Sequence, residues 1–215
     1  MKRIMGIDEA GRGCVIGPMV ICGVVIRHDE SDALVEIGVK DSKTLSARHR
    51  ESLCPKIAAI IERSCVAEVH PREIDEENIN ALGIREIVRM IAAAEPDEVY
   101  MDVPTRGRGI PVYCQKIRAM LPKPDIALIA ENKADAKYPV VSAASIIAKV
   151  ARDTVIAKLH DEYGDFGSGY PSDPRTKKFV SDCYTNAGKF PEIVRHKWLT
   201  VRRFTGPQQS SLPFS

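Results

Sequence analysis

The 215-residue sequence has little of what marks a secreted, membrane or strongly basic protein. The apolar run near its N-terminus, "MVICGVVI" at residues 19–26, is too short to span a bilayer and follows no secretory pattern. Its six cysteines form no C-x-x-C pair and show no spacing typical of a zinc site. These absences predict a cytoplasmic chain with reduced thiols and no membrane partner.

An excess of charge of one sign is also missing, because the net charge is only +2. Composition alone therefore does not indicate a nucleic-acid-binding protein. The charge is nevertheless uneven, since Phe166 to Gly206 holds eight Lys and Arg against three Asp and Glu. At 44% hydrophobic residues, the chain is expected to bury a substantial core, most simply as one domain with an appendage.

Short β-branched runs and helical spacings alternate along the chain. Strands are predicted at "RIMGID" (3–8), "MVICGVVI" (19–26), "CVAEV" (65–69), "DEVYMDV" (97–103) and "DIALIA" (125–130). Helices are predicted from a Ser46 cap to about Glu62 with Pro55 kinking or splitting it, over 81–94 after an Asn80 cap, and over 139–163. The chain is thus an α/β protein with strands first and helices interleaved afterwards.

Acidic residues occur where predicted strands and helices end or begin. Asp8 and Glu9 follow the first strand, Asp102 follows "EVYM", and Asp135 precedes the long helix. A carboxylate that ends a buried strand needs a cation or several hydrogen bonds to offset its desolvation. Clusters of carboxylate oxygens suit Mg²⁺ or Mn²⁺, and two such ions about 4 Å apart can promote phosphodiester hydrolysis. The four acids therefore predict a metal-dependent nuclease site.

The adjacent pair Asp8 and Glu9 raises a geometric difficulty. Successive side chains of a strand point to opposite faces of the sheet, so both can reach one site only where the strand turns. The following "AGRG" supplies glycines for such a turn. Taken alone, an Asp-Glu pair is more simply the start of a solvated loop.

Several motifs occur together in a characteristic order: "GIDEAGRG", "DSKTLS", "YMDVP", "KADAKYPVVSAASIIAKVARD" and "GSGYPSDPRT". In this order and spacing, from Ile4 to about Arg203, the chain resembles ribonuclease HII, most closely its archaeal members. The resemblance implies a ribonuclease H-like fold, with a mixed five-stranded sheet flanked by helices and a helical C-terminal region. It also implies cleavage of the RNA strand of RNA–DNA hybrids, including single ribonucleotides in DNA, that leaves a 3′-hydroxyl and a 5′-phosphate.

The resemblance assigns the acidic residues a catalytic and metal-binding role. Asp8 and Glu9 match the first catalytic pair of the family, Asp102 the third acid and Asp135 the fourth, with Mg²⁺ or Mn²⁺, in two sites, as the cofactor. Asp153 competes with them, but it lies within the long helix, where an ion pair with a neighbouring Lys or Arg explains it.

Substrate binding is expected around a glycine-rich turn. The backbone of Gly11, Arg12 and Gly13 is suited to hydrogen-bonding a 2′-hydroxyl, and Arg12 to reaching a phosphate. Tyr170 precedes a proline, which favours an extended backbone and a displayed ring; by resemblance that ring packs on a deoxyribose. Lys43 matches a phosphate-contacting position of the family. For each residue taken singly, an ordinary structural or surface role is the simpler interpretation.

The C-terminal part divides into a basic region and a tail. We expect a catalytic core at 1–163, a helical basic substrate-binding region at 164–205 and a flexible tail at 206–215. Four basic residues are expected to give sequence-independent affinity for the nucleic-acid backbone: Arg195, Lys197, Arg202 and Arg203.

The tail "QQSSLPFS" resembles a peptide that binds the sliding clamp of replication. Gln209 and Leu212 fit that pattern, but Phe214 comes one residue early and no second aromatic follows. Two interpretations stay open, a clamp-binding peptide and a plain flexible end.

Three other functions compete with a ribonuclease. A nucleotide-binding oxidoreductase would need a helix after its phosphate loop, but "GRGCVIG" has one residue too many and precedes a strand. A DNA nuclease of the same fold would also cut all-DNA substrates. A non-catalytic hybrid-binding protein would not need all four acids. We expect a monomer that acts on RNA–DNA hybrids.

Overall fold

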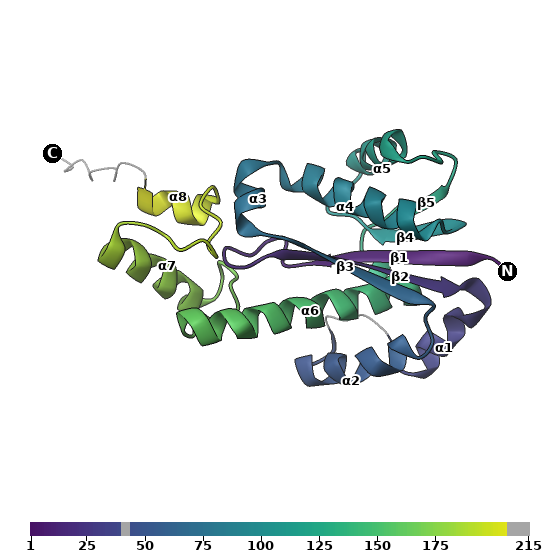
Figure 1. Ribbon diagram of the computed structural model, residues 1–215, viewed down its shortest axis with the longest axis horizontal. Coiled ribbons are helices and arrows are strands. Elements are labelled where there is room, and N and C mark those ends of the chain that lie inside the picture. The colour runs from purple at the N-terminus through teal and green to yellow at the C-terminus, as the bar shows by residue number, and fades with distance from the viewer. Residues whose placement is uncertain (40–43, 206–215) are drawn as a thin grey trace.

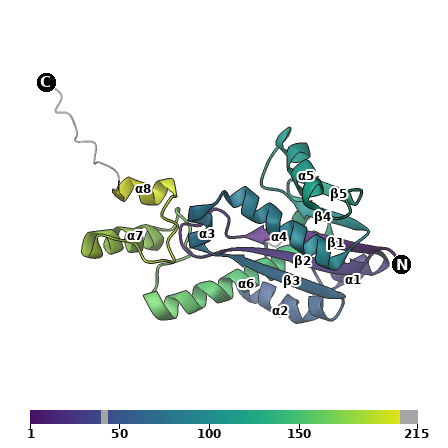
Figure 2. The same ribbon diagram turned by 45° about the horizontal axis from the view of Figure 1, so that its top comes forward.

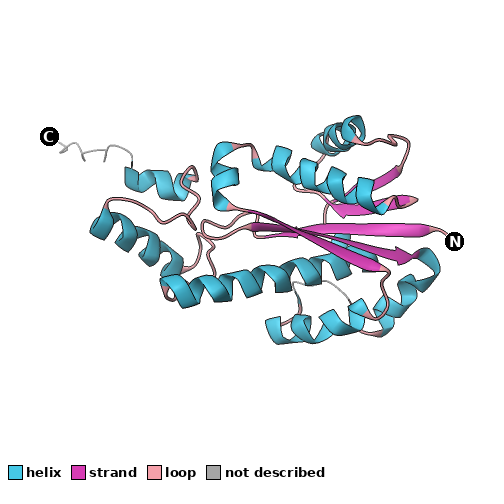
Figure 3. Cartoon of the chain, in the orientation of Figure 1, coloured by secondary structure: helices cyan, strands magenta, loops and turns pink. Residues whose placement is uncertain are grey.

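The computed structural model of the chain describes residues 1–39 and 44–205, which form a sheet between two layers of helices (Figure 1). The strands are β1 (Arg3–Ala10), β2 (Met19–Arg27), β3 (Arg63–Val69), β4 (Glu98–Asp102) and β5 (Ala127–Glu131). Their order is β3-β2-β1-β4-β5; β2 pairs antiparallel with β1 and β3, whereas β1, β4 and β5 are parallel (Figure 3). The predicted mixed five-stranded sheet is confirmed.

Helices cover both faces of this sheet. The helical elements are η1 (His28–Glu30), α1 (Ser31–Glu36), α2 (Ala47–Ala58), α3 (Pro71–Glu76), α4 (Ile79–Ala94), α5 (Gly109–Met120), η3 (Ala134–Ala136), α6 (Pro139–Tyr163), α7 (Pro174–Ala187) and α8 (Leu199–Thr205). Helices α3, α4 and α5 lie on one side of the sheet, and α1, α2 and α6 on the other (Figures 1 and 2). No helix in this described part is long and apolar enough to cross a membrane.

Helix boundaries follow capping chemistry. The hydroxyl of Ser46 accepts the N–H of His49 at 3.2 Å, as predicted, and α2 continues through Pro55 but ends before the predicted Glu62. The predicted Asn80 cap of α4 is wrong. Asn78 caps it instead, because its extended backbone lets its side-chain oxygen accept the first-turn N–H of Asn80 at 2.9 Å.

The alternation of side chains along β1 builds two cores. Met5 and Ile7 pack with α4 and α5, whereas Ile4 packs with α6 on the other face. Gly6 faces α6, where an added Cβ would lie 2.3 Å from the backbone carbonyl carbon of Val140. The start of α6 therefore lies directly on β1. This close packing brings the residues before α6 to the end of β1.

The C-terminal region, with α7 and α8, lies at one end of the sheet and has an apolar cluster of its own (Figure 1). Phe166 and Val180 lie in this cluster together with Val15 and Ile16 of the loop after β1. The predicted boundaries at 163 and 205 stay predictions, and the tail 206–215 lies outside the described residues.

Candidate active site

Three carboxylates from distant parts of the chain meet at one edge of the sheet. One side-chain oxygen of each of Asp8, Asp102 and Asp135 lies within 4.8 Å of the others. Asp8 is near the end of β1, Asp102 ends β4, and Asp135 lies in η3 just before α6. Because β1 and β4 are parallel, their carboxyl ends lie at the same edge. The structure thus brings together three of the four predicted acids.

Two of these carboxylates, those of Asp8 and Asp135, are held away from water, whereas Asp102 is partly buried. Asp8 is 6% exposed and Asp135 only 1%. Burial raises the pKa of Asp8 to about 7, although a hydrogen bond with Ser145 and the charge of Lys149 oppose the rise. Desolvated carboxylates are stabilised by a cation, and an oxygen-only donor set suits a hard divalent ion. The residues present therefore fit Mg²⁺ or Mn²⁺.

Glu9 is placed differently from the other three acids. Strand β1 continues to Ala10, so Glu9 points to the opposite face from Asp8, and the turn expected to unite them comes later. Arg12 binds the Glu9 carboxylate through its Nε and through Nη2, the latter at 3.0 Å, and also donates to Asn80 at 2.9 Å. Glu9 lines the same cavity, but in this structure its carboxylate belongs to an ion pair.

A cavity of about 500 Å³ connects the acids to the predicted substrate-binding residues. Asp8, Glu9 and Asp102 line it together with the loop Gly11–Gly13 and Tyr170. Asp153 also borders the cavity, where it forms an ion pair with Arg50 of α2 at 3.1 Å rather than, as expected, with a neighbour on its own helix. Lys43 lies outside the described residues.

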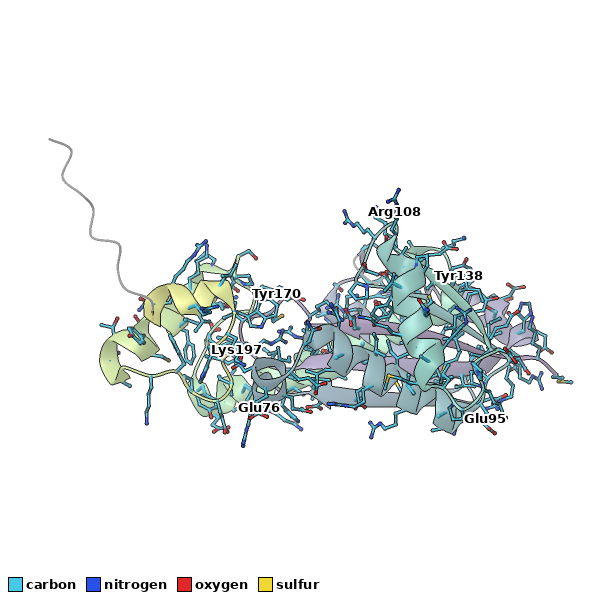
Figure 4. The ribbon with its side chains drawn as sticks, turned by 90° about the horizontal axis from the view of Figure 1, so that it is seen from above. Glu76, Glu95, Arg108, Tyr138, Tyr170 and Lys197 are labelled. Atoms are coloured by element: carbon cyan, nitrogen blue, oxygen red, sulfur yellow. The ribbon has the colours of Figure 1, made fainter. Side chains whose placement is uncertain are left out.

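The loop Gly11–Gly13 is shaped by close packing. Gly11 has a φ of +78°, and an added Cβ would lie 2.4 Å from Nε of Arg152 and 2.7 Å from the carbonyl oxygen of Pro18. Only glycine fits such a position. Tyr170 is 39% exposed and lies where the C-terminal region meets the rest of the molecule (Figure 4). Its ring is therefore partly displayed to solvent, as its position before a proline predicts.

Lys149 and Arg152 of α6 complete the cavity, with Ser145 beside them, and none of the three was predicted as a site residue. Ser145, Lys149 and Arg152 are spaced so that they share one face of the helix. Lys149 donates to Ser145 at 2.7 Å, and the Arg152 guanidinium lies 5.2 Å from the centre of the Tyr170 ring. Polar residues at this spacing, beginning in the mostly apolar first half of the helix, were the available signal.

The expected role of Arg195 in the basic region is wrong. Its side chain is 0% exposed, so it cannot lie on a surface that binds the nucleic-acid backbone. Burial lowers the pKa of Arg195 to about 10, which leaves it charged at neutral pH. Lys197, Arg202 and Arg203 are exposed, as expected.

Comparison with known proteins identifies the family of the chain. The family model described as ribonuclease HII matches residues 5–201. The chain belongs to the ribonuclease HII family. It is 43% identical to ribonuclease HII of Pyrococcus abyssi over 205 residues, covering 94% of this chain and 90% of that one.

Solved structures of family members have the same fold. The crystal structure of ribonuclease H2 from Pyrococcus horikoshii matches with a TM-score of 0.87 and 45% identity, covering 94% of this chain and 96% of that one. RNase HII of Archaeoglobus fulgidus, solved in a complex with PCNA, matches with a TM-score of 0.81 and 40% identity. The match covers 91% of this chain and 94% of that one. The resemblance drawn from the motifs is confirmed, and the fold is the ribonuclease H-like fold.

Membership of this family makes the chain a hydrolytic endoribonuclease that degrades RNA in RNA–DNA hybrids. Its activity is metal-dependent, and the cluster of Asp8, Asp102 and Asp135 provides a place for a metal ion. The oxidoreductase alternative is thereby excluded.

Proposed function

We propose that this chain cuts on the 5′ side of a phosphate in the RNA strand of a hybrid or at a single ribonucleotide in duplex DNA, leaving a 3′-hydroxyl and a 5′-phosphate. The observation that carries this proposal is the convergence of Asp8, Asp102 and Asp135 within 4.8 Å, in a cavity also lined by the Gly11–Gly13 loop. Acids alone suit many nucleases, whereas acids beside a glycine-rich backbone suit one that distinguishes sugars.

Asp8, Asp102 and Asp135 would hold Mg²⁺ or Mn²⁺, in two sites completed by Glu9. When bound, two such ions supply activation of the attacking water and stabilisation of charge on the leaving oxygen. The carboxylates would hold these ions at the edge of the sheet. Burial of Asp8 and Asp135 supports this role, because their charges need a cation for compensation.

Glu9 would join the site when substrate arrives. Arg12 now divides its donors between Glu9 and Asn80. A phosphate in the cavity competes for this guanidinium, since arginine binds phosphates through paired hydrogen bonds. Transfer of Arg12 to the phosphate frees the Glu9 carboxylate for a metal ion. Arg12 thereby serves both as a phosphate ligand and as a counterion in the empty enzyme.

The ribose would be distinguished by the backbone of Gly11, Arg12 and Gly13. The carbonyl oxygen of Gly11 already accepts hydrogen bonds from Arg195 and from the N–H of Cys14, so recognition rests on the N–H groups of the loop and on the carbonyls of Arg12 and Gly13. Tyr170 would pack on the deoxyribose on the 3′ side of the ribonucleotide. Its exposure and its place on the cavity wall support this role. The phosphate contact expected of Lys43 remains part of the proposal.

The experiment that tests this function uses a labelled DNA duplex with one ribonucleotide, digested in Mg²⁺, in Mn²⁺ and with chelator. We expect a single cut that requires a metal ion and leaves the 3′-hydroxyl on the fragment that lacks the ribonucleotide. An all-DNA duplex of the same sequence is the control. Cutting of that control would favour a DNA nuclease, and binding without cutting would favour a hybrid-binding protein.

A sliding clamp is the proposed protein partner, through Gln209, Leu212 and Phe214. The complex of PCNA with the Archaeoglobus protein supports a clamp partner for a related chain. These three residues lie outside the described part, so the proposal rests on sequence and on that relative. The test compares clamp binding of the full chain with a variant that ends at Thr205. Equal binding would favour a plain flexible end.

Oligomeric state and location remain predictions. We propose a monomer, to be checked by light scattering. All six cysteines lie in the described part and are free thiols, which supports the proposed cytoplasmic location. Action in DNA repair or replication follows from the proposed substrates.

A further inference from the structure

Arg195 joins the C-terminal region to the loop that follows β1. Its Nη1 donates to the carbonyl oxygen of Arg12 at 2.7 Å, and its Nη2 to that of Gly11 at 2.7 Å. Nε and Nη2 also donate to the carbonyl oxygen of Gly17, at 3.1 and 2.9 Å. Every nitrogen of this guanidinium therefore bonds to the same loop.

This arrangement depends on the shape of the guanidinium. Arginine presents planar donors in fixed directions, whereas a lysine ammonium offers three donors at a single point. The carbonyls of Gly11, Arg12 and Gly17 come from both ends of one loop, so a planar fork fixes the distance between those ends. The charge is also compensated here, because carbonyl dipoles surround it.

The position of Arg195 is itself fixed by neighbours on two sides. Its backbone N–H donates to the carbonyl oxygen of Val15 at 2.9 Å. The Asp75 carboxylate of α3 accepts the N–H groups of His196 and Lys197 at 2.7 and 2.9 Å. The guanidinium lies 5.2 Å from the ring centre of Trp198. These contacts fix the backbone of residues 195–197 and place the guanidinium beside Trp198.

We propose that Arg195 is a positioning residue, which holds the Gly11–Gly13 loop where its backbone meets the 2′-hydroxyl, without touching the substrate. This inference rests on the proposed ribose recognition by that loop. The scissile phosphate beside that ribose must lie correctly over the carboxylates of the sheet. A misplacement of about 1 Å can cost about 100-fold in rate. Arg195 therefore acts on the chemical step through the loop rather than on overall duplex binding.

The test is Arg195→Lys, assayed on the duplex with one ribonucleotide. We expect kcat to fall at least about 10-fold, since the lysine cannot bond both ends of the loop. The Kd for the duplex, measured in an Asp102→Asn background, should change less than about threefold, because exposed charges supply that affinity. Addition of methylguanidinium to Arg195→Ala should restore part of kcat, because the added guanidinium group can bind where the Arg195 side chain was.

Arg3→Lys is the matched control. Arg3 likewise donates several hydrogen bonds, to the Glu62 carboxylate at 2.8 Å and to the Ala94 carbonyl oxygen at 3.1 Å. It begins β1, at the opposite end of the strand from the acids. It should lower thermal stability without lowering kcat. The comparison thus separates an effect on stability from an effect on positioning.

Three results would overturn the inference. A weaker Kd with unchanged kcat would make Arg195 a direct phosphate ligand. A lower melting temperature with unchanged activity per folded molecule would make it purely structural. If Arg195→Lys does not fold, Trp198→Leu replaces it in the test. We expect kcat of Trp198→Leu to fall about threefold, and an unchanged kcat would contradict the positioning role of Arg195. Failure of the unmodified enzyme to cut the duplex would refute the proposed function instead.

Discussion

The two sides of the cavity are built by different means. On the sheet side, Asp8, Asp102 and Asp135 are carried by β1, β4 and η3, which two large apolar cores hold in place. On the other side, the Gly11–Gly17 loop is fixed by hydrogen bonds and by the buried Arg195, over a small apolar cluster. The chemistry is therefore carried by regular elements, and substrate recognition by loops tied with polar interactions.

This difference suits the two tasks. Carboxylates that share a cation must keep distances of a few ångströms, which packed strands and helices maintain. Recognising a sugar requires backbone groups that no regular element leaves available, because strands and helices use them internally. The C-terminal region supplies the missing support for such a loop. We therefore expect the sheet side to be the more stable and the loop side to open more easily.

The largest expected effect is on the sheet side, in Asp102→Asn. Removing one negative charge from the cluster weakens the hold on divalent ions, so cleavage should fall by about 1,000-fold. Fold and duplex binding should persist, because Asp102 is only partly buried and ends its strand. The measurement is single-turnover cleavage in Mg²⁺ together with circular dichroism. Near-normal cleavage by a folded variant would remove Asp102 from the site.

Next comes the apolar cluster that supports the loop side, probed by Phe166→Ala. Phe166 is 0% exposed and packs against His160 with ring centres 4.2 Å apart. Removing its ring should cost about 3–5 kcal/mol in the free energy of unfolding of the C-terminal region. Hydrogen exchange should quicken in α7 and α8 more than in β1 and β2. Equal quickening throughout would show that the two sides unfold as one unit.

Ile87→Ala is the matched change in the sheet core. Ile87 is 4% exposed and lies in α4 against the sheet. This variant should cost about 2–5 kcal/mol and should quicken exchange across the strands as well. The pair of variants therefore measures how independent the C-terminal region is.

A smaller effect is expected from Tyr170→Ala. The ring lies at the boundary between the two sides, beside Arg152 and the Gly11–Gly13 loop. Without a ring to pack on the sugar, kcat/KM should fall about 10-fold at a lone ribonucleotide, equivalent to about 1.4 kcal/mol. A continuous RNA–DNA hybrid, which offers many registers, should be affected less. Equal activity on the lone ribonucleotide would mean that the ring is structural.

The sequence carried more information about the sheet side than about the loop side. Strand ends could be located from apolar runs, and a carboxylate that ends a buried strand needs a cation or several hydrogen bonds, so Asp8 and Asp102 were predicted. The parallel pairing of β1 and β4, which brings them to one edge, is known only from the structure. The orientation of Glu9 was harder to predict. Strand β1 extends to Ala10, beyond its predicted end at Asp8, and this extension decides which face of the sheet Glu9 occupies. Arg195 could not be placed, since nothing local distinguishes a buried arginine from the exposed ones nearby. Its partners lie far away in the chain, and only the folded structure brings them together.

The smallest expected effect concerns the exposed charges of the C-terminal region, in the triple variant Lys197→Gln, Arg202→Gln and Arg203→Gln. In an Asp102→Asn background, the slope of log affinity against log salt should become shallower by about 0.9 for each phosphate that is no longer bound, so by up to about 3. Lys123→Gln is the control: Lys123 pairs with Glu95 at 2.9 Å, beyond the start of β4 and far from the acids. An unchanged slope in the triple variant would mean that these charges are only solvated. Recognition on the loop side would then depend on the loop and Tyr170 alone.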